Sequence, residues 1–226
     1  MSQSGHSAAP TFQTRLHSNN TSKVPDDRFS YKTAKKTRNI DILVFGDTSA
    51  GKKAFVESFI GIGGATANRM KTSRSQKCEY LLKKVTMPCK TTANVRFWQQ
   101  TQQERPFTTR LFREADCIIY IGDVTKTSAH LSKNLAKFST LVNNECNEDA
   151  IRILVGNKID LKNSRALESS EGQKLANQFR LDKYTETSAL CNIDVSKTID
   201  DILAKISSKT QLRMKDSESS ISISSN

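Results

Sequence analysis

Apolar runs alternate with amphipathic segments along the middle of this 226-residue chain. The runs at 39–45, 78–87, 93–98, 117–124 and 151–160 have the length and composition of strands. Those at 117–124 and 151–160 are nearly all apolar, which is typical of strands buried on both faces of a parallel sheet. Helical patterns cover residues 52–60, 130–142, 170–179 and 194–206. The alternation predicts an α/β domain with a mostly parallel sheet, whose ligands bind at the carboxyl ends of the strands.

The two ends of the chain lack this periodicity. Residues 1–37 are rich in Ser, Thr, Asn and Gln, so we expect a disordered N-terminal extension. Residues 209–226 end in DSESSISISSN, and we expect a disordered Ser-rich tail there. The predicted domain therefore spans residues 38–208.

Composition narrows the class of protein. The formal charge is +12, and 36% of the residues are hydrophobic, which suits a globular domain with basic polar segments. The basic residues are not interleaved with aromatic ones, so we do not expect nucleic acid as the partner. The five cysteines form no CxxC pair, so we expect reduced thiols in a cytoplasmic protein.

A candidate phosphate-binding loop, GDTSAGKK, occupies residues 46–53 between a predicted strand and a predicted helix. Gly46 and Gly51 permit close backbone approach, the loop amides point at phosphates, and Lys52 supplies a charge. A Ser or Thr that ligates Mg²⁺ normally follows this lysine, but here the residue is Lys53. The alternative is a plain strand-to-helix turn with two solvated lysines.

Two further segments match a guanine-reading site: NKID, which begins at Asn157, and TSA, which ends at Ala189. The carboxylate of Asp160 could accept from guanine N1–H and the 2-amino group, which adenine lacks. Asn157 could tether the phosphate loop, and the alkyl stem of Lys158 could cover one face of the base. The backbone N–H of Ala189 could donate to the guanine carbonyl oxygen. A polar loop after a strand would explain either segment alone, but not their order and spacing.

With these residues the chain resembles a Ras-superfamily small GTPase, closest in style to the Rab branch. GDTSAGK, QER, FREADCIIYIGDVT, ILVGNKIDL and TETSA stand in the family's order over nearly all of the predicted domain. The resemblance implies a P-loop NTPase fold, a small G domain with a six-stranded, mostly parallel sheet flanked by five helices. It also implies bound GTP or GDP, protein effectors and regulators, and a role in vesicle traffic or signalling. The nucleotide-binding residues would be Gly46, Asp47, Thr48, Ser49, Ala50, Gly51, Lys52, Lys53, Asn157, Lys158, Asp160, Ser188, Ala189 and Leu190.

The chain departs from the family where Mg²⁺ and the γ-phosphate are handled. Lys53 cannot ligate a cation while it is charged. In QQTQQE (99–104), Gln99 replaces the aspartate that supports Mg²⁺, and Gln102 replaces the glycine that meets the γ-phosphate. Gln103 keeps the place of the water-orienting catalytic glutamine. The first-switch threonine that ligates the metal has no clean equivalent, and Thr72 is only a candidate.

These losses predict guanine nucleotide binding with weak or absent hydrolysis, because phosphoryl transfer depends on metal and positioning. We expect Mg²⁺ to be dispensable, with Lys53 acting as a built-in cation. The alternative is that the site has decayed and Lys53 points into solvent. Two alternatives stay open: a nucleotide-free pseudo-GTPase that serves as an interaction scaffold, and a competent GTPase with an atypical metal site.

We expect a cytoplasmic monomer that is at most peripheral on membranes. The chain ends in Ile223, Ser224, Ser225 and Asn226, and residue 2 is Ser, so neither prenylation nor N-myristoylation is expected. The basic stretch YKTAKKTR would attract an anionic membrane only weakly.

Overall fold

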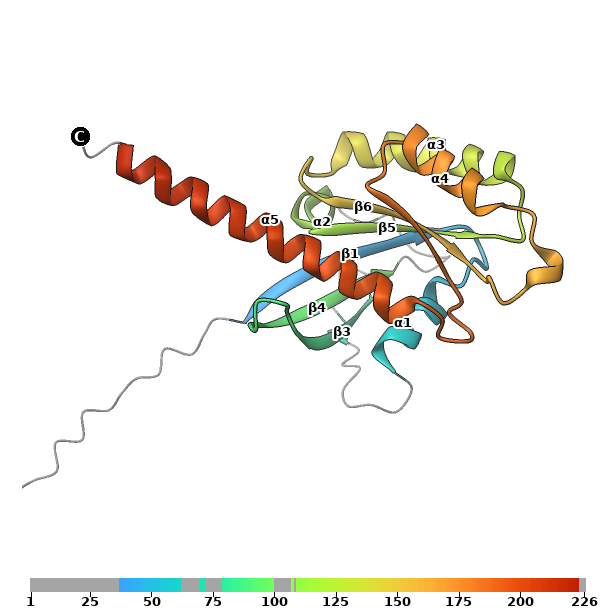
Figure 1. Ribbon diagram of the computed structural model, residues 1–226, viewed down its shortest axis with the longest axis horizontal. Coiled ribbons are helices and arrows are strands. Elements are labelled where there is room, and N and C mark those ends of the chain that lie inside the picture. Colours follow the sequence, from blue (N-terminus) through green and yellow to red (C-terminus); the bar gives the residue numbers. More distant parts are fainter. Residues whose placement is uncertain (1–36, 62–69, 72–78, 100–106, 108, 224–226) are drawn as a thin grey trace, which may run out of the picture. The chain divides into compact units, whose positions relative to one another are not determined.

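The computed structural model of the protein describes residues 37–61, 70–71, 79–99, 107 and 109–223. It confirms the α/β class, with helices on both faces of one sheet (Figure 1). The strand order across the sheet is β2-β3-β4-β1-β5-β6-β7. The bounds of the strands are β1 Arg38–Gly46, β2 Met70–Lys71, β3 Glu79–Thr86, β4 Thr92–Gln99, β5 Cys117–Asp123, β6 Ile151–Asn157 and β7 Lys183–Thr187.

Six of these strands form the expected, mostly parallel sheet. The two residues of β2 extend it at one edge, antiparallel to β3. Strand β3 is also antiparallel to β4, and all the other neighbouring pairs are parallel. The carboxyl ends of the five parallel strands therefore lie along one edge of the sheet.

Five α-helices of the described ranges pack on the sheet: α1 Lys52–Ile60, α2 Thr109–Glu114, α3 Ser128–Glu145, α4 Ser169–Gln178 and α5 Val195–Ile223. A 3₁₀ turn, Lys162–Ser164, follows β6. Buried side chains of α1 and α5 share one core cluster, and those of α2, α3 and α4 share another on the opposite face (Figure 1). None of the helices in the described residues combines the length and apolar character that a membrane span requires.

Helix α3 shows how the sequence sets the orientation of a helix. Its buried residues, Leu131, Leu135, Phe138 and Val142, recur every three or four positions and form one apolar stripe. The hydroxyl of Thr127 caps the helix by accepting from the backbone N–H of His130 at 3.4 Å. The stripe turns toward β5, which leaves polar side chains of the first turns free to reach the phosphate loop.

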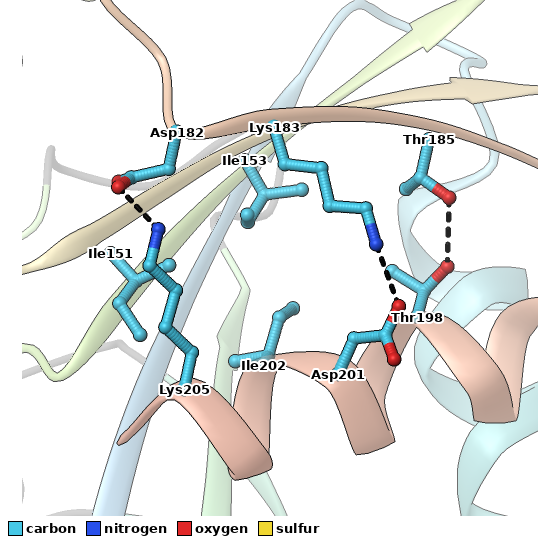
Figure 2. A pocket seen from close by; sticks show the side chains of 9 residues that line it. All are labelled: Ile151, Ile153, Asp182, Lys183, Thr185, Thr198, Asp201, Ile202 and Lys205. Carbon is cyan, nitrogen blue, oxygen red and sulfur yellow. Dashed lines mark hydrogen bonds and ion pairs between the residues drawn. The ribbon is translucent and has the colours of Figure 1, made fainter. Parts of the chain in front are cut away.

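Helix α5 lies along β6 and β7, and two ion pairs fix it there (Figure 2). Lys183 Nζ lies 2.6 Å from Asp201 Oδ2, and Lys205 Nζ lies 2.5 Å from Asp182 Oδ1. Between the pairs a cavity of about 80 Å³ remains over an isoleucine-lined floor. Both pairs stand at the surface, so packing of the buried residues of α5 supplies most of the stabilisation.

The structure continues α5 to Ile223, although the sequence predicted a disordered tail from residue 209. Residues 207–223 contain neither Pro nor Gly, so nothing in the local sequence ends the helix. The predicted extension at 1–37 falls, except for residue 37, outside the described residues.

A buried polar cluster joins β1 to β4. Asp41 is buried and accepts from Arg96 Nε at 2.6 Å, from Arg96 Nη2, and from Trp98 Nε1 at 2.7 Å. Asp41 is also the partner of Arg96 in the strand register. The cluster pins this register, because a slip of one residue would move the carboxylate to the other face of the sheet.

Candidate nucleotide-binding site

Strand register brings the predicted motifs together at the carboxyl edge of the sheet. Gly46 at the end of β1 is level with Ile121 of β5. Asn157 at the end of β6 is level with Asp123 of β5 and with Thr187 of β7. Segments that are more than 100 residues apart in the chain thus meet at one site.

The phosphate loop runs from Gly46 to Gly51, which precedes α1. Its two glycines have φ values of +143° and +92°. A Cβ on Gly46 would lie 2.1 Å from the carbonyl oxygen of Ile121, and one on Gly51 would lie 2.5 Å from Asn157 Nδ2. Both positions therefore require glycine, as the phosphate-loop prediction assumed.

Lys52 folds back over the loop. Its ammonium donates to the carbonyl oxygens of Gly46 at 2.8 Å and Asp47 at 2.7 Å. Partial burial lowers the pKa of Lys52, and the charge of Asp47 offsets part of this effect. The loop thus holds a cation at its mouth, where a phosphate anion would be attracted.

Lys53 occupies the position where the family would place a metal ligand. Its side chain is 68% exposed and lies 3.7 Å from Glu57 Oε1 in an i,i+4 pair. It contributes no oxygen toward the site. A surface pair of this kind contributes about 0.3–0.5 kcal/mol, so Lys53 is free to leave it.

Gln99 occupies the second metal-supporting position, at the end of β4. Its side chain shares the α1 face of the sheet with Phe97, whose ring contacts Phe59 of α1 at 5.6 Å. Its amide nitrogen Nε2 is buried and has no hydrogen-bond partner within the described residues. Lys53 offers a charged nitrogen, and Gln99 offers a neutral carbonyl oxygen in place of a carboxylate, so the two positions fit Mg²⁺ poorly. In the same residues no cluster of three or more His, Cys, Asp or Glu side chains is placed to hold a metal.

Asn157 joins the phosphate loop to the segment at 187–189, where β7 ends. Its Nδ2 donates to the carbonyl oxygen of Ala50 at 2.8 Å. Its Oδ1 accepts from the backbone N–H of Ala189 at 2.9 Å and from the hydroxyl of Thr187 at 3.2 Å. The predicted tether to the phosphate loop is thus present, while the N–H of Ala189 is directed at Asn157.

The predicted base-reading carboxylate is held by its neighbours. Ser188 is buried and donates from Oγ to Asp160 Oδ1 at 2.5 Å, and its Oγ accepts from Cys191 N at 3.1 Å. Leu190 is 84% exposed at the rim, which would suit apolar contact with a base. The sequence predicted these positions, but not the hydroxyl that orients Asp160.

The ammonium of Lys158 has a partner that the sequence analysis did not predict. Its ammonium donates to Asp123 Oδ2 at 2.6 Å, and Asp123 Oδ1 accepts from the backbone and hydroxyl of Thr125. Burial alone would raise the pKa of Asp123, but these hydrogen bonds outweigh it and lower the pKa. Sequence reasoning missed Asp123, although an acidic residue that ends an apolar strand at this edge was a visible signal.

The remaining predicted residues divide into two groups. The side chains of Thr48 and Ser49 are exposed, and Ala50 is buried beneath the loop. The catalytic candidate Gln103, the neighbouring Gln102 and the metal-ligand candidate Thr72 lie outside the described residues, so their roles stay predictions.

Ser49 has a φ of +63°, in the left-handed region that non-glycine residues rarely adopt. We expect Ser49→Gly to raise the free energy of unfolding by about 1 kcal/mol, because the substitution removes this strain. Urea unfolding of the two proteins would measure the difference. Thr48→Gly is the matched control. A loss of stability in Ser49→Gly would mean that the Ser49 side chain makes contacts that outweigh the strain.

Comparison with known proteins agrees with this geometry. The sequence model of the Ras family matches residues 41–208, which is more than half of the chain. Ras-related protein Rab-10 from Diplobatis ommata is 28% identical, over 82% of this chain and 90% of its own length. Ras-related protein RABC1 from Arabidopsis thaliana is 30% identical, over 73% and 76%. Human Ras-related protein Rab-12 is 28% identical, over 74% and 68%. The chain therefore belongs to the Ras family, as a divergent, Rab-like small GTPase.

Proposed function

We propose that the protein binds GTP or GDP without requiring Mg²⁺, and that it hydrolyses GTP slowly or not at all. Membership of the Ras family supports guanine nucleotide as the ligand and proteins as effectors or regulators. A role in vesicle traffic or signalling is part of the same proposal. The domain would span residues 38–208.

One contrast within the site carries the proposal. The base-reading side is assembled, since Asn157 ties the two loops together and Ser188 orients Asp160. The two metal-supporting positions hold Lys53, whose charge repels a cation, and Gln99, a neutral amide in place of a carboxylate. A site of this composition favours the phosphates over the metal.

The missing metal charge would come from Lys53. Its pair with Glu57 is exposed and long, so little free energy opposes a swing toward the phosphates. Two unit charges about 4 Å apart interact by about 4 kcal/mol at an effective dielectric constant of 20. The Nε2 of Gln99, which has no partner among the described residues, would add an uncharged donor on the same face of the sheet.

The first experiment is to denature the purified protein and to chromatograph what it releases. Guanine nucleotide in near-equal amount supports the proposal. An empty protein that also ignores added GTP and GDP identifies the scaffold alternative. Single-turnover hydrolysis in Mg²⁺ then separates the proposal from a competent GTPase with an atypical metal site.

The metal requirement gives a direct prediction. We expect EDTA to leave the GDP affinity of the native protein unchanged, and Lys53→Ser to lower the affinity in EDTA about tenfold or more. Added Mg²⁺ should restore part of the Lys53→Ser affinity, because the serine hydroxyl can ligate the ion. Fluorescence titration with a labelled GDP measures both effects. Lys197→Ser, at an exposed position of α5, is the control. A large loss of native affinity in EDTA would contradict metal independence.

A further inference from the structure

Asp47, the acidic residue of the phosphate loop, is held by side chains from two other elements. Tyr120 of β5 donates its hydroxyl proton to Oδ1, and Asn134 of α3 donates from Nδ2 to the same atom at 2.8 Å. Burial raises the pKa of Tyr120, and the bond to Asp47 raises it further, so the hydroxyl keeps its proton. The side chain of Asp47 is only 11% exposed. We call these residues, together with His130, the Asp47 clamp.

The second oxygen of Asp47, Oδ2, is buried and has no hydrogen-bond partner in the part of the chain that the structure describes. His130 Nε2 lies 3.4 Å away. The same Nε2 lies 3.2 Å from Asn134 Nδ2. An amide nitrogen only donates, so His130 Nε2 accepts from Asn134 when it carries no proton. Protonated Nε2 donates instead, and Oδ2 of Asp47 is the acceptor within reach.

Among the described residues, two acids on the elements that pack against α3 have partners other than His130. Glu171 of α4 accepts from Ser128, and Arg110 of α2 pairs with Glu114. The lysines of α3 itself, Lys133 and Lys137, are exposed to water. Within the described residues, Asp47 is thus the acid with which His130 pairs.

The clamp acts on the loop that would hold the phosphates. The carbonyl oxygen of Asp47 accepts from Lys52, so any shift of Asp47 also shifts the ammonium at the mouth of the loop. Protonated His130 would also neutralise the carboxylate, which otherwise repels a phosphate. This neutralisation favours anion binding, and the bond to Lys52 couples it to the charge at the mouth of the loop.

We propose that Tyr120, Asn134 and His130 position the phosphate loop through Asp47, and that protonation of His130 raises the affinity of the loop for nucleotide phosphates. This inference rests on the proposed function for its ligand. All members of the Asp47 clamp are positioning residues, because they would act on the nucleotide phosphates only through the phosphate loop and Lys52.

Amide hydrogen exchange on the full chain without nucleotide tests the positioning itself. Asn134→Ala should speed the exchange of the amides of residues 47–52 by about tenfold, because one of the two donors to Oδ1 is lost. Asn144→Ala, at an exposed position of the same helix, should leave them unchanged. Asp47→Asn should remain close to the native rate, since an amide Oδ1 still accepts from Tyr120 and Asn134. Equal loop exchange in Asn134→Ala and native protein would overturn the clamp.

Ligand competition tests the consequence for phosphates. Asn134→Ala should lower the affinity for GDP about tenfold and leave the affinity for guanosine unchanged, because guanosine lacks phosphates. Equal losses for both ligands, with lower thermal stability, would show a merely structural role and overturn the inference.

A pH series isolates His130. Between about pH 5.5 and about pH 8, GDP affinity should fall with rising pH about fivefold more in native protein than in His130→Gln. The phosphates of GDP also titrate, but they affect both proteins equally, so the difference between native protein and His130→Gln excludes their contribution. Identical slopes would overturn the role of His130. A native protein that binds neither GDP nor GTP would refute the proposed function, while hydrogen exchange would still decide the clamp.

Discussion

Replacing Asp160 with alanine is expected to reduce the affinity for GDP about a thousandfold. The carboxylate would accept two hydrogen bonds from guanine, and each bond to a charged acceptor contributes about 1.5–3 kcal/mol. Ser188 holds Oδ1 at 2.5 Å, so the native carboxylate is already oriented before the base arrives. The lower GDP affinity of Asp160→Ala should therefore come from the missing hydrogen bonds to guanine.

Inosine diphosphate makes this experiment specific, because inosine lacks the 2-amino group of guanine. Native protein should prefer GDP to inosine diphosphate, and Asp160→Ala should bind the two equally. Calorimetric titration of both nucleotides measures the preference. Asp200→Ala removes an exposed carboxylate from α5 and serves as the control. If Asp160→Ala keeps the preference for GDP, another group reads the base.

The second large effect concerns stability. Asp41→Ala should lower the free energy of unfolding by about 3 kcal/mol, because it leaves Arg96 and the indole N–H of Trp98 without their buried acceptor. This value lies at the lower end for a broken buried pair, since 26% of the Arg96 side chain remains exposed. Urea unfolding followed by circular dichroism measures the change.

Two variants separate charge from packing in this cluster. Asp41→Asn keeps an acceptor for Trp98 and should cost less than Asp41→Ala. The double variant Asp41→Leu, Arg96→Leu should recover much of the loss, because no charge is left unpaired. Asn39→Ala, two positions earlier on β1 and exposed, controls for changes to the strand. A stability of Asp41→Ala within about 0.5 kcal/mol of native would mean that water replaces the missing partner.

Sequence patterns predicted the strands and helices that build the site, because local periodicity reports burial. They also placed Gly46, Lys52, Asn157 and Asp160 at one edge of the sheet, since parallel strands end together there. The Asp41 cluster was not predictable in this way. Its contacts depend on the register of β1 against β4, two strands about 50 residues apart, which no local pattern encodes.

The same limit applies to the charged residues of the site. Lys53 was predicted to supply a charge to the phosphates, which stays a prediction, but its pairing with Glu57 in the structure was not foreseen. The alkyl stem of Lys158 was predicted to cover the base, which stays a prediction, but the pairing of its ammonium with Asp123 was not foreseen. The choice between ligand and neighbour depends on side-chain rotamers, which sequence spacing leaves open. Tyr120 was missed because a tyrosine in an apolar strand is usually read as core.

The polar cluster has an optical consequence. Trp98 is the single tryptophan of the chain, is 6% exposed, and lies 4.6 Å from the ring of Tyr80. Its fluorescence emission therefore reports on one place only, the contact between β1 and β4. Trp98 also directly precedes Gln99 in the sequence. Intrinsic fluorescence would follow this join without any label, and nucleotide added at the neighbouring edge of the sheet would be visible as a change in the same signal.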